Sequence, residues 1–210
     1  MTEQERVDKV ANAMAYLHDT AVAYLQSPYS DLCLTAIQQY DQGYGGSKHH
    51  HNYIGGLAVH VADVVRRCLD LSGTDRAPQL YPTANVDLTV LLTSAYWHDY
   101  GELAEYAWKE TPGPFSELFG SKSDGYVATT PYAKLCGHVV GSAYEFLEVV
   151  RGADLAEADH QATVDAIVHC MLAHHGRKEW GSPVEPATIE AWILHAADLM
   201  SSREGALNGL

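Results

Sequence analysis

The chain has 210 residues and a formal net charge of −14, because 27 Asp and Glu residues outnumber 13 Lys and Arg residues. The length suits one domain, and an apolar fraction of 47% excludes disordered, collagen-like and coiled-coil proteins. A protein that tracks long nucleic acid normally carries a basic face, so the few scattered basic residues argue against that class and leave small anionic ligands open.

Residues 1–46 are predicted to form N-terminal helices that pack on the core. Apolar residues recur at helical intervals over 3–25, and Pro28 follows this pattern. A second helix is expected over 29–42, where it runs into the glycines of GYGGSKHHHNY. Residues 47–210 are expected to form the functional domain, in one globular unit with these helices.

Helical spacing of apolar residues returns in five further segments, and no segment keeps the strict alternation of a strand. The prolines and glycines of residues 107–131 predict a long loop. The fold class is therefore predicted to be all-α, a compact bundle of about six to eight helices. The five segments are 55–71, 86–101 with Asn85 or Asp87 as its cap, 134–150, 161–174 and 188–200.

Histidine is abundant, with 12 residues in all, and it is the commonest metal ligand. Imidazole or carboxylate groups lie at otherwise apolar positions of five predicted helices. Burying such groups without partners would cost about 1–3 kcal/mol each, so a shared bound ion would explain them. These groups are His60, His98, Asp99, His138, His174, His175 and Asp198.

One cation would use four of these groups, and two cations that share a bridging carboxylate would use all of them. Two divalent ions ~3.5–4 Å apart repel each other unless an anion lies between them. The mixed nitrogen and oxygen ligands suit Mn, Fe, Co or Zn and argue against Ca or Mg. The expected cofactor is therefore a pair of divalent transition metal ions, whose identity stays open.

The order His60…His98-Asp99…Asp198 resembles the HD superfamily of metal-dependent phosphohydrolases. The added His138 and His174-His175 resemble the dinuclear members of that superfamily. Three segments are similar to the HD domain of YhaM-type 3′-to-5′ exoribonucleases. They are HHHNYIGGLAVHV (49–61), KLCGHVVGSAYEFL (134–147) and HHGRKEWGSPVEPATIEAWILHAADLMSSR (174–203), which together cover most of residues 47–204.

The resemblance implies two metals that share Asp99, which is thereby assigned a catalytic role. One metal would also be bound by His60, His98 and Asp198. The other would be completed by His138, His174 and His175. Activation of a water by these metals implies hydrolysis of a phosphoester in a nucleotide, a short oligonucleotide or a similar small phosphorylated substrate.

Two features depart from the relatives. They often read His-Asp-x-Gly-Lys, whereas this chain has Glu102 in place of the lysine. Because a carboxylate repels phosphate, Glu102 is expected to hold a metal-bound water, to pair with a base or to mark a different substrate. The exoribonucleases also carry an OB-type domain ahead of the HD domain, where this chain has residues 1–46. We therefore expect small substrates and no long nucleic acid.

Candidate substrate-binding residues lie in loops beside the predicted ligands. Arg177 directly follows the His pair, and its planar guanidinium suits phosphate oxygens. Four aromatic residues, Trp180, Tyr53, Tyr100 and Tyr106, could stack on a base or simply pack in the core or at the rim. The full set assigned to substrate is His50, His51, Lys122, Arg177 and Lys178.

Two other functions stay open at this point. Some HD-fold proteins hold two irons and use O₂ to break C–C or C–P bonds. The absence of a lysine at position 102, where this chain has Glu102, is compatible with this chemistry. A nucleotide-binding sensor that keeps the ligands without turnover is the other. Apolar helix faces are also compatible with a homo-oligomer.

The sequence contains no apolar run of the ~18–20 residues that a bilayer crossing requires. The N-terminal sequence MTEQERVDKV carries charges where a signal peptide has its apolar stretch. We therefore expect a cytoplasmic protein without a membrane partner.

Overall fold

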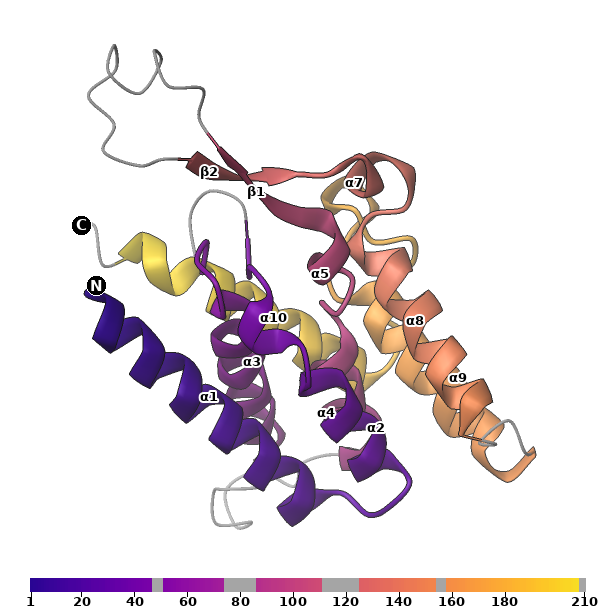
Figure 1. The fold of residues 1–210 in the computed structure, drawn as a ribbon. Helices are drawn as coiled ribbons and strands as arrows, with labels where there is room; N and C mark the ends of the chain where they lie inside the picture. Colours follow the sequence, from indigo (N-terminus) through magenta and orange to yellow (C-terminus); the bar gives the residue numbers. More distant parts are fainter. Residues whose placement is uncertain (47–50, 74–85, 111–124, 154–157, 208–210) are drawn as a thin grey trace.

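The computed structural model describes residues 1–46, 51–73, 86–110, 125–153 and 158–207. Helices dominate these residues, so the predicted helical fold class is confirmed (Figure 1). The α-helices are α1 (Glu3–Tyr24), α2 (Tyr29–Ile37), α3 (Gly56–Ser72), α4 (Leu88–Trp97), α5 (Glu102–Glu105), α7 (Pro131–Leu135), α8 (His138–Gly152), α9 (Ala158–Ala173) and α10 (Ile189–Leu207). The other elements of the described residues are two 3₁₀ helices, η1 (Tyr40–Gln42) and η2 (Lys178–Trp180), and two strands, β1 (Tyr106–Glu110) and β2 (Gly125–Thr129).

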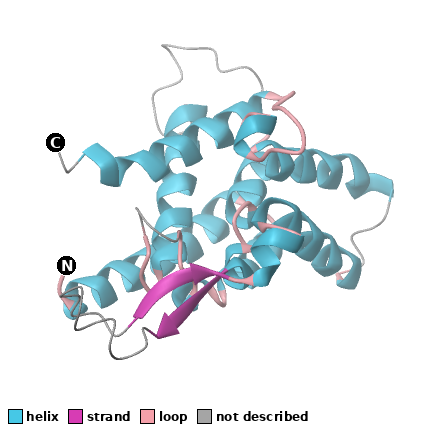
Figure 2. Cartoon of the chain, turned by 90° about the horizontal axis from the view of Figure 1, so that it is seen from above, coloured by secondary structure: helices cyan, strands magenta, loops and turns pink. Residues whose placement is uncertain are grey.

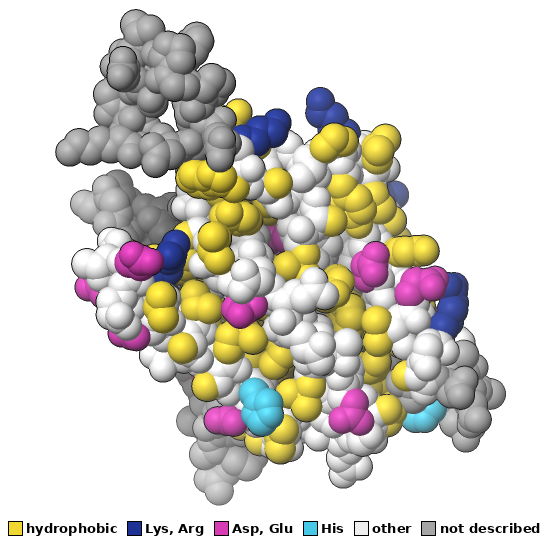
Figure 3. Space-filling view, in the orientation of Figure 1, with side chains coloured by type: hydrophobic (Ala, Val, Ile, Leu, Met, Phe, Trp, Pro, Cys, Tyr) yellow, Lys and Arg dark blue, Asp and Glu magenta, His cyan; other side chains and the backbone are white. Residues whose placement is uncertain are grey.

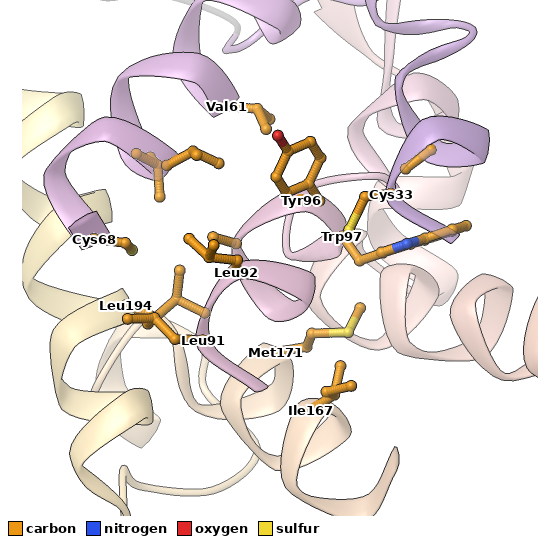
Figure 4. Close-up of a cluster of buried hydrophobic side chains, with 14 of the residues drawn as sticks. Cys33, Val61, Cys68, Leu91, Leu92, Tyr96, Trp97, Ile167, Met171 and Leu194 are labelled. Carbon is orange, nitrogen blue, oxygen red and sulfur yellow. The ribbon is translucent and has the colours of Figure 1, made fainter. Parts of the chain in front are cut away.

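Helix α4 lies in the middle of the bundle, where it packs against α2, α3, α8, α9 and α10. Every residue from Val90 to Trp97 is buried, because this helix is apolar on all sides. Figure 4 shows its side chains among those of the surrounding helices. The C-terminal end of α4 therefore places His98 and Asp99 deep inside the molecule.

The start of α4 is held by Asp87, one of the two residues predicted as its cap. The Asp87 Oδ1 accepts hydrogen bonds from the backbone N–H groups of Thr89 at 2.9 Å and Val90 at 3.2 Å. The backbone N–H of Asp87 donates to Glu190 Oε1 at 2.9 Å, which ties this end of α4 to α10.

Replacement of Asp87 by Ala is expected to lower the free energy of unfolding by about 1 kcal/mol, because two N–H groups lose their acceptor. The measurement is urea denaturation followed by circular dichroism. Asp87→Asn keeps an acceptor oxygen and should recover most of the loss. An unchanged midpoint for Asp87→Ala would contradict the capping role.

The prediction that the chain has no strand is wrong. Strands β1 and β2 pair antiparallel from Tyr106↔Thr129 to Glu110↔Gly125, and all of their residues except Tyr106 fall in the segment 107–131 that was predicted as a loop. The hairpin lies at the edge of the helical bundle (Figure 2). Each strand has five residues, which is too short for alternation to stand out, although their aromatic and β-branched residues favour strands.

Two predicted helices are each divided in the structure. The segment 29–42 forms α2 and η1, and the segment 134–150 begins within α7 and continues in α8. Gly137, at φ 71°, separates α7 from α8 and makes His138 the first residue of its helix. The N-terminal helices share one buried cluster with the rest of the chain, in which α1 packs against α3 and α2 against α4. The division at residue 46 stays a prediction.

The surface shown in Figure 3 carries few Lys and Arg side chains, and these lie apart from one another. Apolar and acidic side chains occupy more of this face. Among the described residues, none of the helices combines the length and the apolar character needed to cross a membrane.

Candidate metal centre

The fold brings all seven predicted ligand groups together in the interior. They come from α3, from the C-terminal end of α4, from the first residue of α8, from the turn after α9 and from α10. They form two adjoining groups, and within each group the potential ligand atoms lie within 4.8 Å of one another. The first group is His60, His98, Asp99 and Asp198, and the second is His138, His174 and His175.

Asp99 faces both groups, each with a different oxygen. Its Oδ2 lies 3.1 Å from His60 Nε2 and 3.2 Å from His98 Nε2. Its Oδ1 lies 3.4 Å from His174 Nε2 and 3.7 Å from His138 Nε2. Ligands that lie about 2.0–2.2 Å from one cation are about 3–3.5 Å from each other. The spacing around Asp99 is therefore close to what two cations bridged by one carboxylate require.

The Nδ1 atom of every imidazole in the two groups has a hydrogen-bond partner, which fixes the direction of the ring. His98 and His174 donate to the carbonyl oxygens of Ala95 and Met171 at 2.8 and 2.6 Å. The other three contacts are His175 to the Trp180 carbonyl at 2.9 Å, His138 to Glu105 Oε2 at 2.9 Å and His60 to Ser201 Oγ at 3.1 Å. A carbonyl can only accept, so Nδ1 carries the proton where it faces one, and Nε2 presents its lone pair to the centre.

Several atoms at the centre have no hydrogen-bond partner among the described residues. Asp99 Oδ1 and His174 Nε2 are both buried and both lack one. The Nε2 atoms of His138 and His175 lie 3.2 Å apart. Buried polar atoms without a partner are costly, so this donor set fits a bound divalent transition metal.

The charges at the first group are arranged as ion pairs in the metal-free protein. Burial alone would raise the pKa of Asp99, but the neighbouring imidazoles of His98, His174 and His60 hold it well below its usual range. Asp198 behaves in the same way, since its hydrogen bond with His60 offsets burial and lowers its pKa to about 2. Both carboxylates are therefore ionised and ready to bind a cation.

Glu102 lies at the N-terminal end of α5, is only 6% exposed and lines the central cavity. Its Oε2 has no hydrogen-bond partner in the described part of the chain. Burial, and then the charge of Asp99, raise the pKa of this carboxyl well above its usual range. Its position beside the ligands is consistent with the first expected role, a catalytic one in which Glu102 holds a metal-bound water, and this role stays a prediction.

Gly101, two residues after Asp99, lies against the start of α8 and leaves no room for a side chain. A Cβ atom at this position would lie 2.7 Å from Cα and from the carbonyl oxygen of His138. The Gly101 N–H also donates to Ser142 Oγ at 2.8 Å. The absence of a side chain thus allows the start of α8 to approach α4 and brings His138 to the centre.

A cavity of about 370 Å³ opens beside the two groups. Its wall includes Glu102, His195, Trp180 and Arg203 in addition to ligand residues. Arg203 is the only Lys or Arg among the described lining residues, and sequence reasoning did not select it. The sequence did offer one indication of Arg203, because it is the last residue of the segment 174–203 that resembles the relatives.

The predicted substrate-binding residues have mixed outcomes. The His51 ring lies 5.7 Å from that of His60, next to the centre. Arg177 and Lys178 are exposed and do not line the cavity, although the Arg177 guanidinium lies 5.2 Å from the ring centre of Trp180. His50 and Lys122 lie outside the described residues.

The chain is similar to proteins named 3′-5′ exoribonuclease YhaM. It is 34% identical to the protein of Listeria welshimeri and 33% identical to one of Listeria monocytogenes, in each case over 74% of this chain and 41% of the relative. It is 27% identical to the protein of Bacillus pumilus over 93% of this chain and 54% of the relative. The chain thus matches about half or less of the length of these relatives. The predicted resemblance is confirmed.

No family model matches the chain, and no solved structure matches it. The names of the relatives contradict the expectation that long nucleic acid is excluded, because an exoribonuclease acts on an RNA chain. That expectation relied on the net charge of −14. Net charge averages over the whole surface, whereas phosphate binding depends on cations and basic groups at the site itself.

Proposed function

We propose that this chain is a metal-dependent phosphodiesterase that removes nucleotides from the 3′ end of RNA. The observation that carries the proposal is the convergence of four imidazoles on the two oxygens of Asp99, with the ring of His175 grouped beside two of them. The RNA substrate is supported by the name of the relatives. The same name favours hydrolysis over the oxygenase and sensor alternatives.

Two cations, when bound, would neutralise phosphate charge and lower the pKa of a shared water toward ~7. The His Nε2 atoms and the carboxylates of Asp99 and Asp198 would hold them. Glu102, with a free Oε2 in the cavity, would accept a hydrogen bond from the attacking water and orient it. The water oxygen would bond to phosphorus as its proton passes to Glu102. The bond from phosphorus to the 3′ oxygen would break, and that oxygen would take up a proton to give a 3′ hydroxyl.

The phosphate contacts are assigned to Arg203 and Arg177. Arg203 lines the cavity, where its guanidinium can donate two hydrogen bonds to one phosphate. Arg177 and Lys178 lie outside the cavity and would contact the RNA backbone further along the strand. Residues 47–210 contain every proposed ligand, and residues 1–46 would support them by packing.

Purified protein loaded with Mn²⁺ is expected to shorten a 5′-labelled RNA oligonucleotide from its 3′ end and to release nucleoside 5′-monophosphates. Gel electrophoresis follows the oligonucleotide, and chromatography identifies the product. The reaction should stop with a chelator, resume with added metal and proceed without air. A dinucleotide and a long RNA, compared in parallel, report the preferred length. Absence of product with Mn, Fe, Co and Zn would contradict the proposal.

A further inference from the structure

Trp180 is a large aromatic residue on the wall of the metal cavity. It lines the cavity and yet remains 53% exposed. Trp97 of the same chain is, by contrast, fully buried in the core. The fold therefore leaves the apolar surface of this indole uncovered beside the proposed catalytic groups.

The backbone around Trp180 is fixed by hydrogen bonds. Its N–H donates to the Arg177 carbonyl at 3.0 Å, and its own carbonyl accepts from His175 Nδ1 at 2.9 Å. Gly181 follows with φ 101°, a conformation that other residues rarely adopt. One turn thus connects the indole directly to a proposed ligand of the metal centre.

The surroundings of the indole ring suit a flat aromatic ligand. The Arg177 guanidinium lies 5.2 Å from its ring centre, a cation–π contact that also keeps a positive charge close to an approaching phosphate. The centre of the His195 ring lies 6.1 Å from that of Trp180, and the two rings are tilted by 32°. A cavity of about 370 Å³ lies at the small end of ligand pockets, which suits about one nucleotide.

We propose that Trp180 stacks on the base of the 3′-terminal nucleotide of the RNA while its phosphodiester lies at the metal centre. The inference rests on the proposed function and adds a subsite for the base. Stacking uses the π face that every base has, so it tolerates any base identity. Such a subsite would let the enzyme remove successive nucleotides irrespective of sequence.

The test compares Trp180→Ala with Trp180→Phe on two RNA oligonucleotides, one complete and one with an abasic 3′-terminal residue. On the complete RNA, Trp180→Ala should lower kcat/KM about 5- to 100-fold, mainly through KM, and Trp180→Phe should retain most activity. On the abasic RNA, wild type and Trp180→Ala should be equal. Metal content should stay unchanged in both variants.

Trp192 and Trp108 provide matched controls. They are 53% and 50% exposed, but neither lines the cavity, so Trp192→Ala and Trp108→Ala should behave as wild type on both substrates. Equal losses for Trp180→Ala on complete and abasic RNA would indicate a structural role through His175 and would overturn the proposal. No loss on either substrate would overturn it as well.

Equilibrium binding separates this inference from the proposed function. The same two oligonucleotides are prepared with an uncleavable methylphosphonate at the last linkage, and binding is followed by fluorescence anisotropy. Preference of wild type, but not of Trp180→Ala, for the base-bearing oligonucleotide supports stacking even if neither RNA is ever cut. Cleavage of RNA without such a preference would retain the proposed function and overturn the subsite.

Discussion

Replacing Asp99 by Ala is expected to remove both cations from the protein and to lower RNA hydrolysis by about 10³-fold or more. The two Asp99 oxygens face different groups of imidazoles, at 3.1 and 3.2 Å on one side and 3.4 and 3.7 Å on the other. Loss of the bridge leaves two divalent ions to repel each other, so each ion destabilises the other. Several kcal/mol of lost transition-state stabilisation corresponds to this rate loss at 1.36 kcal/mol per tenfold.

Asp198 gives the informative comparison, because its carboxylate belongs to one group only. Its Oδ1 lies 3.3 Å from His60 Nε2, and it is not part of the group formed by His138, His174 and His175. Asp198→Ala is therefore expected to lose one cation and to keep the other. Elemental analysis after gel filtration measures the metal content, and a steady-state assay measures the rate.

Asp70→Ala controls for the loss of a carboxylate as such. Asp70 is exposed on α3, the helix that carries His60, so this variant should retain both metals and full activity. Two cations per chain in Asp99→Ala would overturn the bridging role. Retention of activity in that variant would do so independently.

The order of the ligands along the chain was predictable because each ligand interrupts an apolar helical pattern. His60 lies between valines in α3, and His98-Asp99 follows a strongly apolar run. The adjacent pair His174-His175 was harder to interpret, since neighbouring helical residues point about 100° apart. The structure resolves this because α9 ends at Ala173, and Gly176 has φ 81°, so both rings reach His138 or Asp99.

The contacts that orient the imidazoles were less predictable from the sequence. His98 and His174 each donate to the carbonyl three residues earlier, which is a local feature of a helix end. The partners of His60 and His138 come from elements distant in the chain, α10 and α5. No spacing rule links such pairs, because they depend on how the helices pack.

The cavity wall was only partly predictable for the same reason. Arg203 and Trp180 are far apart in sequence and meet only through the packing of α10 beside η2 and the turn after α9. Conversely, Arg177 was selected for its place next to the His pair, yet it lies outside the wall. Proximity in sequence to a ligand thus does not by itself place a residue on the cavity wall.

Replacing Glu105 is the second change for which we expect a large effect, in this case on the affinity for metal. The Glu105 Oε2 accepts hydrogen bonds from both the backbone N–H of His138 at 2.7 Å and His138 Nδ1 at 2.9 Å. Carboxylates in this position orient a metal-binding imidazole and raise its basicity, and their loss typically costs 10- to 100-fold in metal affinity. Glu105→Gln should therefore weaken one of the two cation sites by about 10- to 100-fold near pH 9.

The loss of affinity should become smaller as the pH falls toward 7. Burial lowers the pKa of His138, but the Glu105 hydrogen bond and nearby carboxylate charges outweigh burial and raise it to about 9 in the metal-free protein. Below that pH a proton competes with the cation for His138. Glu105→Gln lowers the affinity of His138 for this proton as well as its affinity for the metal, so the two effects partly cancel. Calorimetric titration with Zn²⁺ or Mn²⁺ between pH 7 and 9 measures the trend.

The effect of Glu105→Gln on the stability of the metal-free protein should change with pH in the opposite direction. The role of Glu105 can therefore be tested by a second, independent measurement. A His whose pKa is raised by folding stabilises the folded state below its unfolded pKa of about 6.5, and this stabilisation is lost as the pH rises through about 9. The difference in unfolding free energy between wild type and Glu105→Gln should therefore shrink with rising pH while the difference in metal affinity grows. Glu145→Gln, an exposed change on the same helix as His138, should alter neither quantity. If both differences were independent of pH, Glu105 would act by packing alone, and its charge would have no part in tuning His138.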